Sequence, residues 1–192
     1  MRIGVGLPNT IPDTPGPRLI EWAREAESMG FSSHATIGRQ VFPGYEELQA
    51  LAAAAAVTDR IELLTNVAIG PVYDKALLAK LAAGVDQISD GRFVLGLAPG
   101  WRDEDFIVAG KPYAGRGKRF DEEIEYMQRA WRGELVEGAT KRLTPVPANG
   151  ETVPLAFGGN SRRAYERAAE YGVGWTAGGA SPDDVRGFFE TA

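Results

Sequence analysis

Short apolar runs alternate along the chain with longer segments in which apolar residues recur at helical spacing. The short runs are rich in Val, Ile and Leu, as expected for strands covered on both faces of a parallel sheet. Regular alternation of such strands with helices predicts repeated βα units and the α/β class. Strands are predicted at 3–7, 34–38, 61–67, 93–97, 153–157 and 174–177.

Helices are predicted between most of these strands, because apolar side chains recur there every three or four positions. The helix at 75–89 places Leu77, Leu81, Val85 and Ile88 on one face, and we expect this stripe to point toward the core. Asp74 precedes that helix as a candidate N-cap. The other helices are predicted at about 17–29, 48–57, 120–131 and 161–171, with a last one opening at Ser181-Pro182.

The helix at 48–57 contains an unbroken alanine run over 52–56 and has no polar face. A helix that is apolar all round is usually buried on two sides. One side would pack on the sheet, and the other could accept a second subunit. The alternative is strong intrinsic propensity, since alanine is the best helix former. The first interpretation predicts a homodimer formed through the helices at 48–57 and 75–89.

Periodicity is lost over 133–152, where Pro145, Pro147, Asn149 and Gly150 mark turns. This segment predicts an irregular insertion between the fourth and fifth βα units. Six units can be counted in the 192 residues. A chain of this length is expected to form a single domain, 1–192.

Composition and charge limit the kinds of molecule that this chain is expected to bind. Hydrophobic residues make up 44% of the chain and the formal net charge is -5, so the surface is mildly acidic and nucleic-acid binding is disfavoured. The absence of cysteine excludes disulfides and fits a reducing, cytoplasmic compartment. Neither a signal peptide nor a membrane-spanning segment is predicted. No residue spacing typical of a metal site stands out, so no metal is expected.

Two glycine-rich loops follow the strands at 153–157 and 174–177. Glycines let backbone approach a ligand closely, and a helix N-terminus offers free N–H groups and partial positive charge to an anion. The alternative is a tight turn in which Asn160 or Ser161 only caps the next helix. Repetition of the arrangement one unit later favours a phosphate cradle built from both loops.

Four segments resemble the luciferase-like monooxygenase family in their amino-acid sequences and in their order along the chain. These segments are Ile61 to Pro71, Gly91 to Trp101, the Gly-Gly-Asn-Ser loop and the Gly-Trp-Thr-Ala-Gly-Gly loop. The resemblance extends over nearly all of 1–192. It implies a TIM-barrel-like (β/α) parallel barrel that is incomplete, since about 250 residues are usual for eight units. It further implies an oxidoreductase or monooxygenase that uses FMN or coenzyme F420 on a small organic substrate.

The resemblance also implies which residues contact the cofactor. In this family the two glycine loops hold the coenzyme phosphate. A backbone bulge after the third strand, commonly with a non-prolyl cis peptide, presses against the ring and matches Asn66-Val67 here, although nothing in those two residues themselves encodes a cis bond. The implied cofactor contacts are Asn66, Val67, Ala68, Gly158, Gly159, Asn160, Ser161, Thr176, Gly178 and Gly179.

Other positions depart from the family pattern. After the second strand many relatives carry an acid or histidine, whereas this chain has Ile37-Gly38-Arg39-Gln40. Pro99 stands where luciferase-type members have a basic phosphate contact, and Trp101 where deazaflavin dehydrogenases have an acid. His34, the only histidine, lies in an apolar strand and is expected to be structural. No catalytic residue is therefore assigned. The alternatives are a non-catalytic or cofactor-binding shortened barrel, or a fragment of a longer enzyme of this family.

Overall fold

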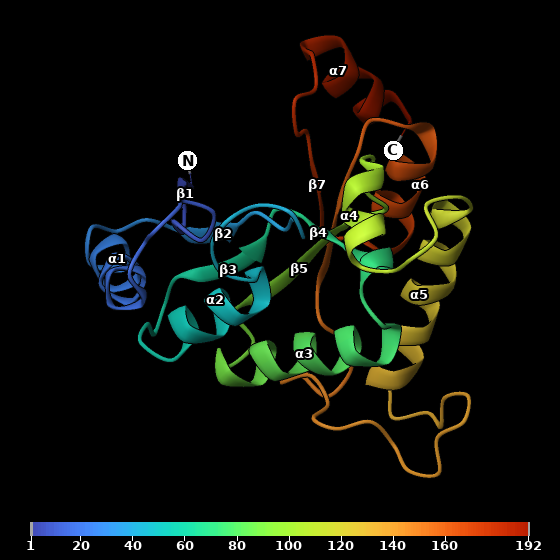
Figure 1. Ribbon diagram of the computed structural model, residues 1–192, viewed down its shortest axis with the longest axis horizontal. Coiled ribbons are helices and arrows are strands. Elements are labelled where there is room, and N and C mark those ends of the chain that lie inside the picture. Colours follow the sequence, from blue (N-terminus) through green and yellow to red (C-terminus); the bar gives the residue numbers. More distant parts are fainter. Residues whose placement is uncertain (1, 192) are drawn as a thin grey trace.

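A parallel sheet organises the computed structural model, which describes residues 2–191 (Figure 1). Its strands are, in chain order, β1 (Gly4–Gly6), β2 (Ser33–Thr36), β3 (Glu62–Thr65), β4 (Ala68–Ile69), β5 (Phe93–Ala98), β6 (Leu155–Gly158) and β7 (Gly174–Thr176). The strand order β1-β2-β3-β5-β6-β7 is sequential and every pair is parallel. This confirms the predicted parallel βα sheet. The strand predicted at 61–67 ends at Thr65, and a separate short strand that was not predicted, β4, follows it and pairs with β5.

Helices connect the strands. They are α1 (Gly16–Ser28), α2 (Glu47–Ala55), the 3-10 turn η1 (Gly70–Val72), α3 (Lys75–Ile88), α4 (Asp103–Val108), α5 (Arg116–Trp131), α6 (Arg162–Tyr171) and α7 (Pro182–Thr191). The helix α4 was not predicted. The Asp74 cap is confirmed, because its Oδ1 accepts the N–H groups of Ala76 and Leu77 at 3.0 and 3.1 Å. None of the helices within residues 2–191 is long and apolar enough to cross a bilayer.

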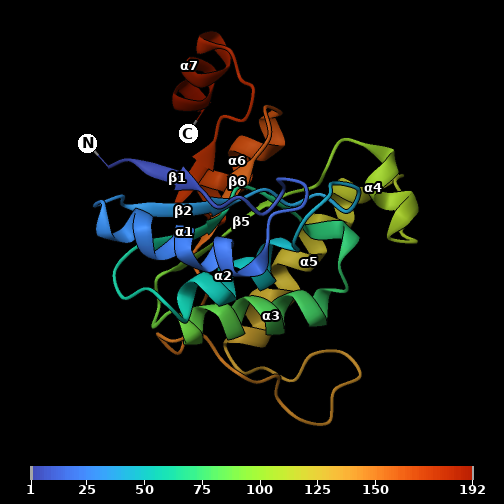
Figure 2. The same cartoon turned by 60° about the vertical axis from the view of Figure 1, so that its left-hand side comes forward.

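The sheet curves without closing. Within the described residues, β1 pairs only with β2, and β7 pairs only with β6, so both ends of the sheet are open edges. The helices α1, α2, α3 and α5 wrap the outer side, and α7 extends away beyond β7 (Figures 1 and 2). The architecture is a TIM-barrel-like half-barrel, as the resemblance implied.

The segment between α5 and β6 is irregular, as predicted: residues 132–154 contain no helix or strand. It forms the long loop at the bottom of Figure 1. The C-terminal end of α3 holds this loop in place. The carboxylate of Asp86 accepts the N–H of Ala148 at 2.7 Å, and the side chain of Gln87 donates to the carbonyl of Val146 at 2.9 Å.

The orientation predicted for α3 was wrong. Leu77, Leu81 and Ile88 are 52%, 37% and 54% exposed, and only Val85 of the predicted stripe is buried. Periodicity shows that a helix has an apolar face, but α3 has two such faces and the smaller residues pack inward. Small side chains let a helix approach the sheet closely. The buried residues of α3 are Leu78, Ala79, Ala82, Ala83, Val85 and Asp86.

The helix α2 is enclosed on the sheet side. It contacts β2 and β3 beneath it and α1 and α3 on its flanks, and Leu48, Leu51 and Ala54 are buried. Its outer side and the exposed stripe of α3 border a shallow hollow of about 660 Å³, here called the α2–α3 groove. The groove is lined by Glu46, Leu48, Gln49, Ala52, Tyr73, Leu77, Lys80, Leu81, Gly84, Val85, Ile88 and Pro145.

Candidate functional site

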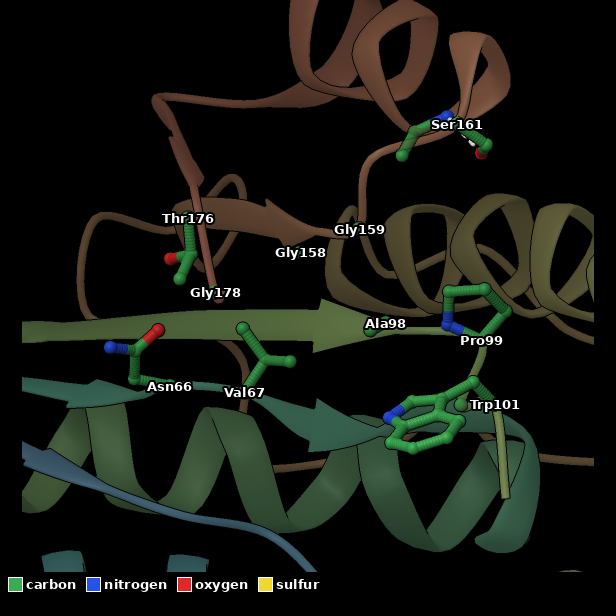
Figure 3. A pocket seen from close by; sticks show the side chains of 12 residues that line it. Asn66, Val67, Ala98, Pro99, Trp101, Gly158, Gly159, Ser161, Thr176 and Gly178 are labelled. Atoms are coloured by element: carbon green, nitrogen blue, oxygen red, sulfur yellow. Dashed lines mark hydrogen bonds between the residues drawn. The ribbon is translucent and has the colours of Figure 1, made fainter. Parts of the chain in front are cut away.

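A pocket of about 260 Å³ lies where the carboxyl ends of the third to sixth units meet. In Figure 3, Asn66 and Val67 lie on one side of β5, and Gly158, Gly159 and Thr176 lie on the other. Parallel α/β proteins bind ligands at this end of the strands. We call it the central pocket. Its lining is Asn66, Val67, Ala98, Pro99, Gly100, Trp101, Gly158, Gly159, Ser161, Ala164, Thr176 and Gly178.

The floor of the central pocket is formed where β3 ends and β4 follows. The Asn66-Val67 peptide is cis, as the resemblance implied, and it separates β3 from β4. The Val67 side chain then lies against the ends of the neighbouring strands: a Cβ on Gly158 would come within 3.0 Å of it. Ala68, also implied as a contact, is buried in β4 and does not line the pocket.

The first glycine loop supplies one wall. Gly159 has a φ of 116°, a conformation that L side chains rarely adopt. Ser161 is the N-cap of α6, since its Oγ accepts the N–H of Ala164 at 3.2 Å. Ser161 therefore caps α6, as one of the two interpretations predicted. This cap leaves the Ser161 hydroxyl hydrogen able to donate to a ligand. Asn160 is exposed and does not line the pocket.

The second glycine loop forms the facing wall. Thr176 at the end of β7 and Gly178 both line the pocket, whereas Gly179 lies outside the lining. Trp175 joins the two loops, because its indole N–H donates to the carbonyl of Gly159 at 2.8 Å. Seven of the ten residues implied by the resemblance thus converge on one pocket, and Ala68, Asn160 and Gly179 do not line it.

Two residues noted in the sequence, Trp101 and His34, lie in different environments. Trp101 is 74% exposed at the mouth of the central pocket, with the Arg102 guanidinium 4.5 Å from its ring centroid. His34 is fully buried, and its Nε2 lies 3.2 Å from the Ala23 carbonyl oxygen. Burial lowers the pKa of His34, which favours the neutral ring. This histidine is a structural residue, as expected.

A buried ion pair joins the segment after β2 to α4, and the sequence did not reveal it. Arg39 Nε donates to Asp105 Oδ1 and Oδ2 at 3.0 and 2.8 Å, and the Gln40 N–H donates to Oδ1 at 3.0 Å. The Asp105 side chain is 1% exposed and that of Arg39 is 11% exposed. The sequence pattern does not mark α4, because the helix begins with three consecutive acids, Asp103, Glu104 and Asp105. The hydrophobic Phe106 that follows was the signal for a packed helix.

Beneath the same segment lies a buried acid, which the sequence also did not reveal. Glu47 is 3% exposed, and its Oε1 lies so close to Gly38 that a Cβ there would collide with it. The Tyr73 hydroxyl is 2.7 Å from Glu47 Oε1 and 2.8 Å from Glu46 Oε1. Burial raises the pKa of Glu47 to about 7, against the opposing hydrogen bond from Tyr73. A protonated Glu47 donating to Tyr73, which donates to Glu46, satisfies both short contacts.

The part of the chain that the structure describes contains no group of three or more His, Cys, Asp or Glu side chains able to hold a metal ion. The central pocket instead offers backbone, hydroxyl and apolar groups. Such a lining can bind a planar ring against Val67 and an anion near Ser161. It presents no carboxylate or imidazole of its own to a substrate.

Comparisons with known proteins agree with this architecture. The sequence matches the family model for luciferase-like monooxygenases over residues 1–192. An uncharacterized protein of Mycobacterium tuberculosis is 33% identical over 150 residues, which cover 74% of this chain and 51% of the relative. The chain therefore spans about half the length of this relative.

Two solved structures resemble the fold. The oxygenating constituent of 3,6-diketocamphane monooxygenase from Pseudomonas putida, in complex with FMN, has a TM-score of 0.79 and 19% identity, covering 100% of this chain and 61% of that protein. The coenzyme F420 dependent tetrahydromethanopterin reductase from Methanopyrus kandleri has a TM-score of 0.74 and 21% identity, covering 91% and 55%. At these identities the likeness shows the fold alone.

Proposed function

Because the chain belongs to the luciferase-like monooxygenase family, we propose that it binds FMN or coenzyme F420 in the central pocket and serves as an oxidoreductase for a small organic substrate. The observation that carries the proposal is that Asn66 and Val67 line one pocket together with residues of both glycine loops. Two proteins of the same fold support the choice of cofactor, since their names specify FMN and F420.

The residues of the central pocket fit such a cofactor. Val67 and Ala98 offer an apolar surface to a planar ring, and Gly178 has no atom within 4 Å of the position of an added Cβ, so a ligand could approach its backbone. Ser161 and the N-terminus of α6 suit a phosphate. A volume of about 260 Å³ lies just below the roughly 300 Å³ at which ligand pockets begin, so part of the cofactor would remain exposed.

When bound, the flavin or deazaflavin supplies the redox chemistry, and the protein positions it and the substrate. Val67 would support one face of the ring, and the glycine loops would hold its phosphate. Trp101 stands at the mouth, where it would cover a substrate placed over the ring. We assign no acid or base, because the lining contains none.

The proposal is tested by calorimetry with FMN and with F420, in oxidised and reduced forms, on the folded protein. Gly178→Asp places a negative charge in the pocket without a backbone clash, since nothing lies within 4 Å of an added Cβ. This variant should abolish binding, whereas Gly178→Ala should retain it. Failure of the wild-type protein to bind either cofactor refutes the proposal.

We also propose that two copies of the chain associate through the α2–α3 groove. The exposed stripe of α3 supports this, because three large aliphatic side chains lie there side by side and over a third of each is in water. Contiguous apolar surface of this kind commonly marks a protein interface. In a two-fold dimer each groove would receive the same stripe from the other copy.

A further inference from the structure

A second hollow, of about 480 Å³, adjoins the central pocket and shares Pro99 and Ser161 with it. Figure 3 shows these two residues at the same end of the central pocket, beyond the end of β5. We call this hollow the cationic groove, because four cations and one acid line it. These five residues are Arg116, Lys118, Asp121, Arg163 and Arg167.

Three of the four cations already have carboxylate partners. Asp121 accepts from Arg167 Nε at 2.7 Å and lies 3.3 Å from Arg163 Nη2. Lys118 is 85% exposed and lies 3.7 Å from Glu122. Arg163 also lies 3.4 Å from Glu166, so each of these three cations is balanced by a carboxylate in or beside the groove.

Arg116 differs from these three residues. Its Nε donates to the carbonyl oxygen of Gly100 at 2.8 Å, and its guanidinium lies 3.8 Å from the centroid of the Tyr113 ring. Within residues 2–191, no carboxylate comes within ion-pair distance of it. The stack and the hydrogen bond fix the plane of the guanidinium and leave its two terminal nitrogens available to an acceptor.

Two helix ends reinforce this charge. Arg116 is the first residue of α5, and Ser161 caps the start of α6, so both helices direct their N-termini toward the groove. A helix N-terminus carries partial positive charge and favours an anion. The fixed cation, the capping hydroxyl and the two helix ends therefore favour a negative group at the junction of the groove and the central pocket.

We propose that Arg116 is the cationic contact for the phosphate of the ligand held in the central pocket. This inference rests on the function proposed above. The shared chemistry is a phosphate ester, which FMN carries at the end of its ribityl chain and F420 carries at the corresponding position. The ring would lie against Val67, and the phosphate would bind between Ser161 and Arg116.

The test compares each cofactor with its counterpart that lacks the phosphate. FMN is paired with riboflavin, and F420 with its deazariboflavin chromophore. Wild-type protein should bind the phosphorylated member of the pair more tightly, and added salt should reduce this difference. Arg116→Gln should weaken binding of the phosphorylated form by about 10-fold to 100-fold, as loss of a charge-assisted hydrogen bond predicts. It should change binding of the counterpart less than about twofold.

Two variants serve as controls. Lys118→Gln removes an exposed charge from the same groove and should change affinity for either form by less than about twofold. Arg116→Lys keeps the charge but not the planar fork, and should recover part of the loss. Circular dichroism shows whether each variant is folded.

The possible failures are distinguishable. Equal weakening of both forms by Arg116→Gln would mean that the residue only positions Gly100, and would overturn the inference. Equal affinity of the wild-type protein for both forms would do the same without any variant, and would leave the proposed function standing. Absence of all flavin and deazaflavin binding would refute the proposed function together with this inference.

Discussion

Single residues decide how the half-barrel responds to pH. Glu47 and Glu123 are both buried, and burial raises the pKa of each to about 7. The Glu123 carboxyl packs near Gly70, and its Oε2 has no hydrogen-bond partner among the described residues. An acid whose pKa is raised on folding binds its proton more tightly in the folded state. Both residues therefore stabilise the fold at low pH, and that contribution is lost as the pH rises toward 7.

Glu47→Gln should make the stability less dependent on pH. The contribution of Glu47 is fully present below its unfolded pKa of about 4.3 and is lost as the pH rises through about 7. At most about 4 kcal/mol is lost, because each pKa unit between these two values corresponds to about 1.36 kcal/mol. The amide imitates the protonated acid, so the variant should lose less stability between pH 5 and about pH 8 in urea titrations.

The exposed carboxyl of Glu21 on α1 provides the control. Glu21→Gln should leave the pH dependence unchanged, because solvent screens an exposed group. The same pH dependence in Glu47→Gln and in the wild-type protein would contradict the assignment of a protonated Glu47.

At this scale the sequence revealed backbone features better than buried charges. Asn66-Val67 and Gly158 were assigned through the family resemblance, which carries the loop positions of relatives over to matching segments of this sequence. Glu47 and Asp105 were not, because their burial depends on elements that the fold brings together from distant parts of the chain. Periodicity marks Glu47 only as the polar residue that precedes an alanine-rich helix.

At the scale of elements, α4 shows how a short helix is held by one buried aromatic side chain and one buried ion pair. It has only the residues Asp103–Val108, and Ile107 and Val108 are exposed. Phe106 packs in a small cluster with Ile69 and Val72, and Asp105 holds the segment after β2 through Arg39. The pair thus connects the second unit to the fourth across the face that carries the central pocket.

Removing one member of this pair should destabilise the protein strongly. Asp105→Ala leaves the Arg39 guanidinium largely buried without its carboxylate, which typically costs about 3 to 5 kcal/mol. Glu104→Ala is the matched control, since that carboxyl is 64% exposed and lies 4.0 Å from the same guanidinium. The control should lose less than about 1 kcal/mol. Chemical denaturation measures the free energy of unfolding of both variants. A similar decrease in the two would show that the buried ion pair does not stabilise this part of the fold.

Strand and helix positions were largely predictable, and helix orientation was not. The strands at 93–97 and 174–177 were found to within one residue, because continuous apolar runs end at turn residues. The solvent-facing orientation of the α3 stripe was not predicted, because Leu77 and Leu81 have the same spacing as residues of a core-facing stripe. Only the neighbours of a helix decide which of two apolar faces is covered.

The molecule as a whole exposes surfaces that a closed barrel would cover. Within the described residues, β1 and β7 each pair on one side only, and a hollow of about 430 Å³ lies along β1, β2 and β3. Unpaired strand edges present free N–H and C=O groups that can pair with another chain. Counting βα units in the sequence predicted the openness. The α2–α3 groove is a separate surface on the outer side, and its apolar character requires its own explanation.

The proposed dimer can be tested by placing a charge in that groove. Leu81 lines the α2–α3 groove and is 37% exposed. Leu81→Glu should therefore leave the fold intact and place an unpaired carboxylate in the proposed dimer interface. Sedimentation equilibrium at micromolar concentration should show a wild-type dimer and a monomeric variant. Ile107→Glu on α4 makes the same change at a residue 73% exposed elsewhere and should remain dimeric. A monomeric wild-type protein, or a dimer unaffected by Leu81→Glu, would mean that this stripe has another role.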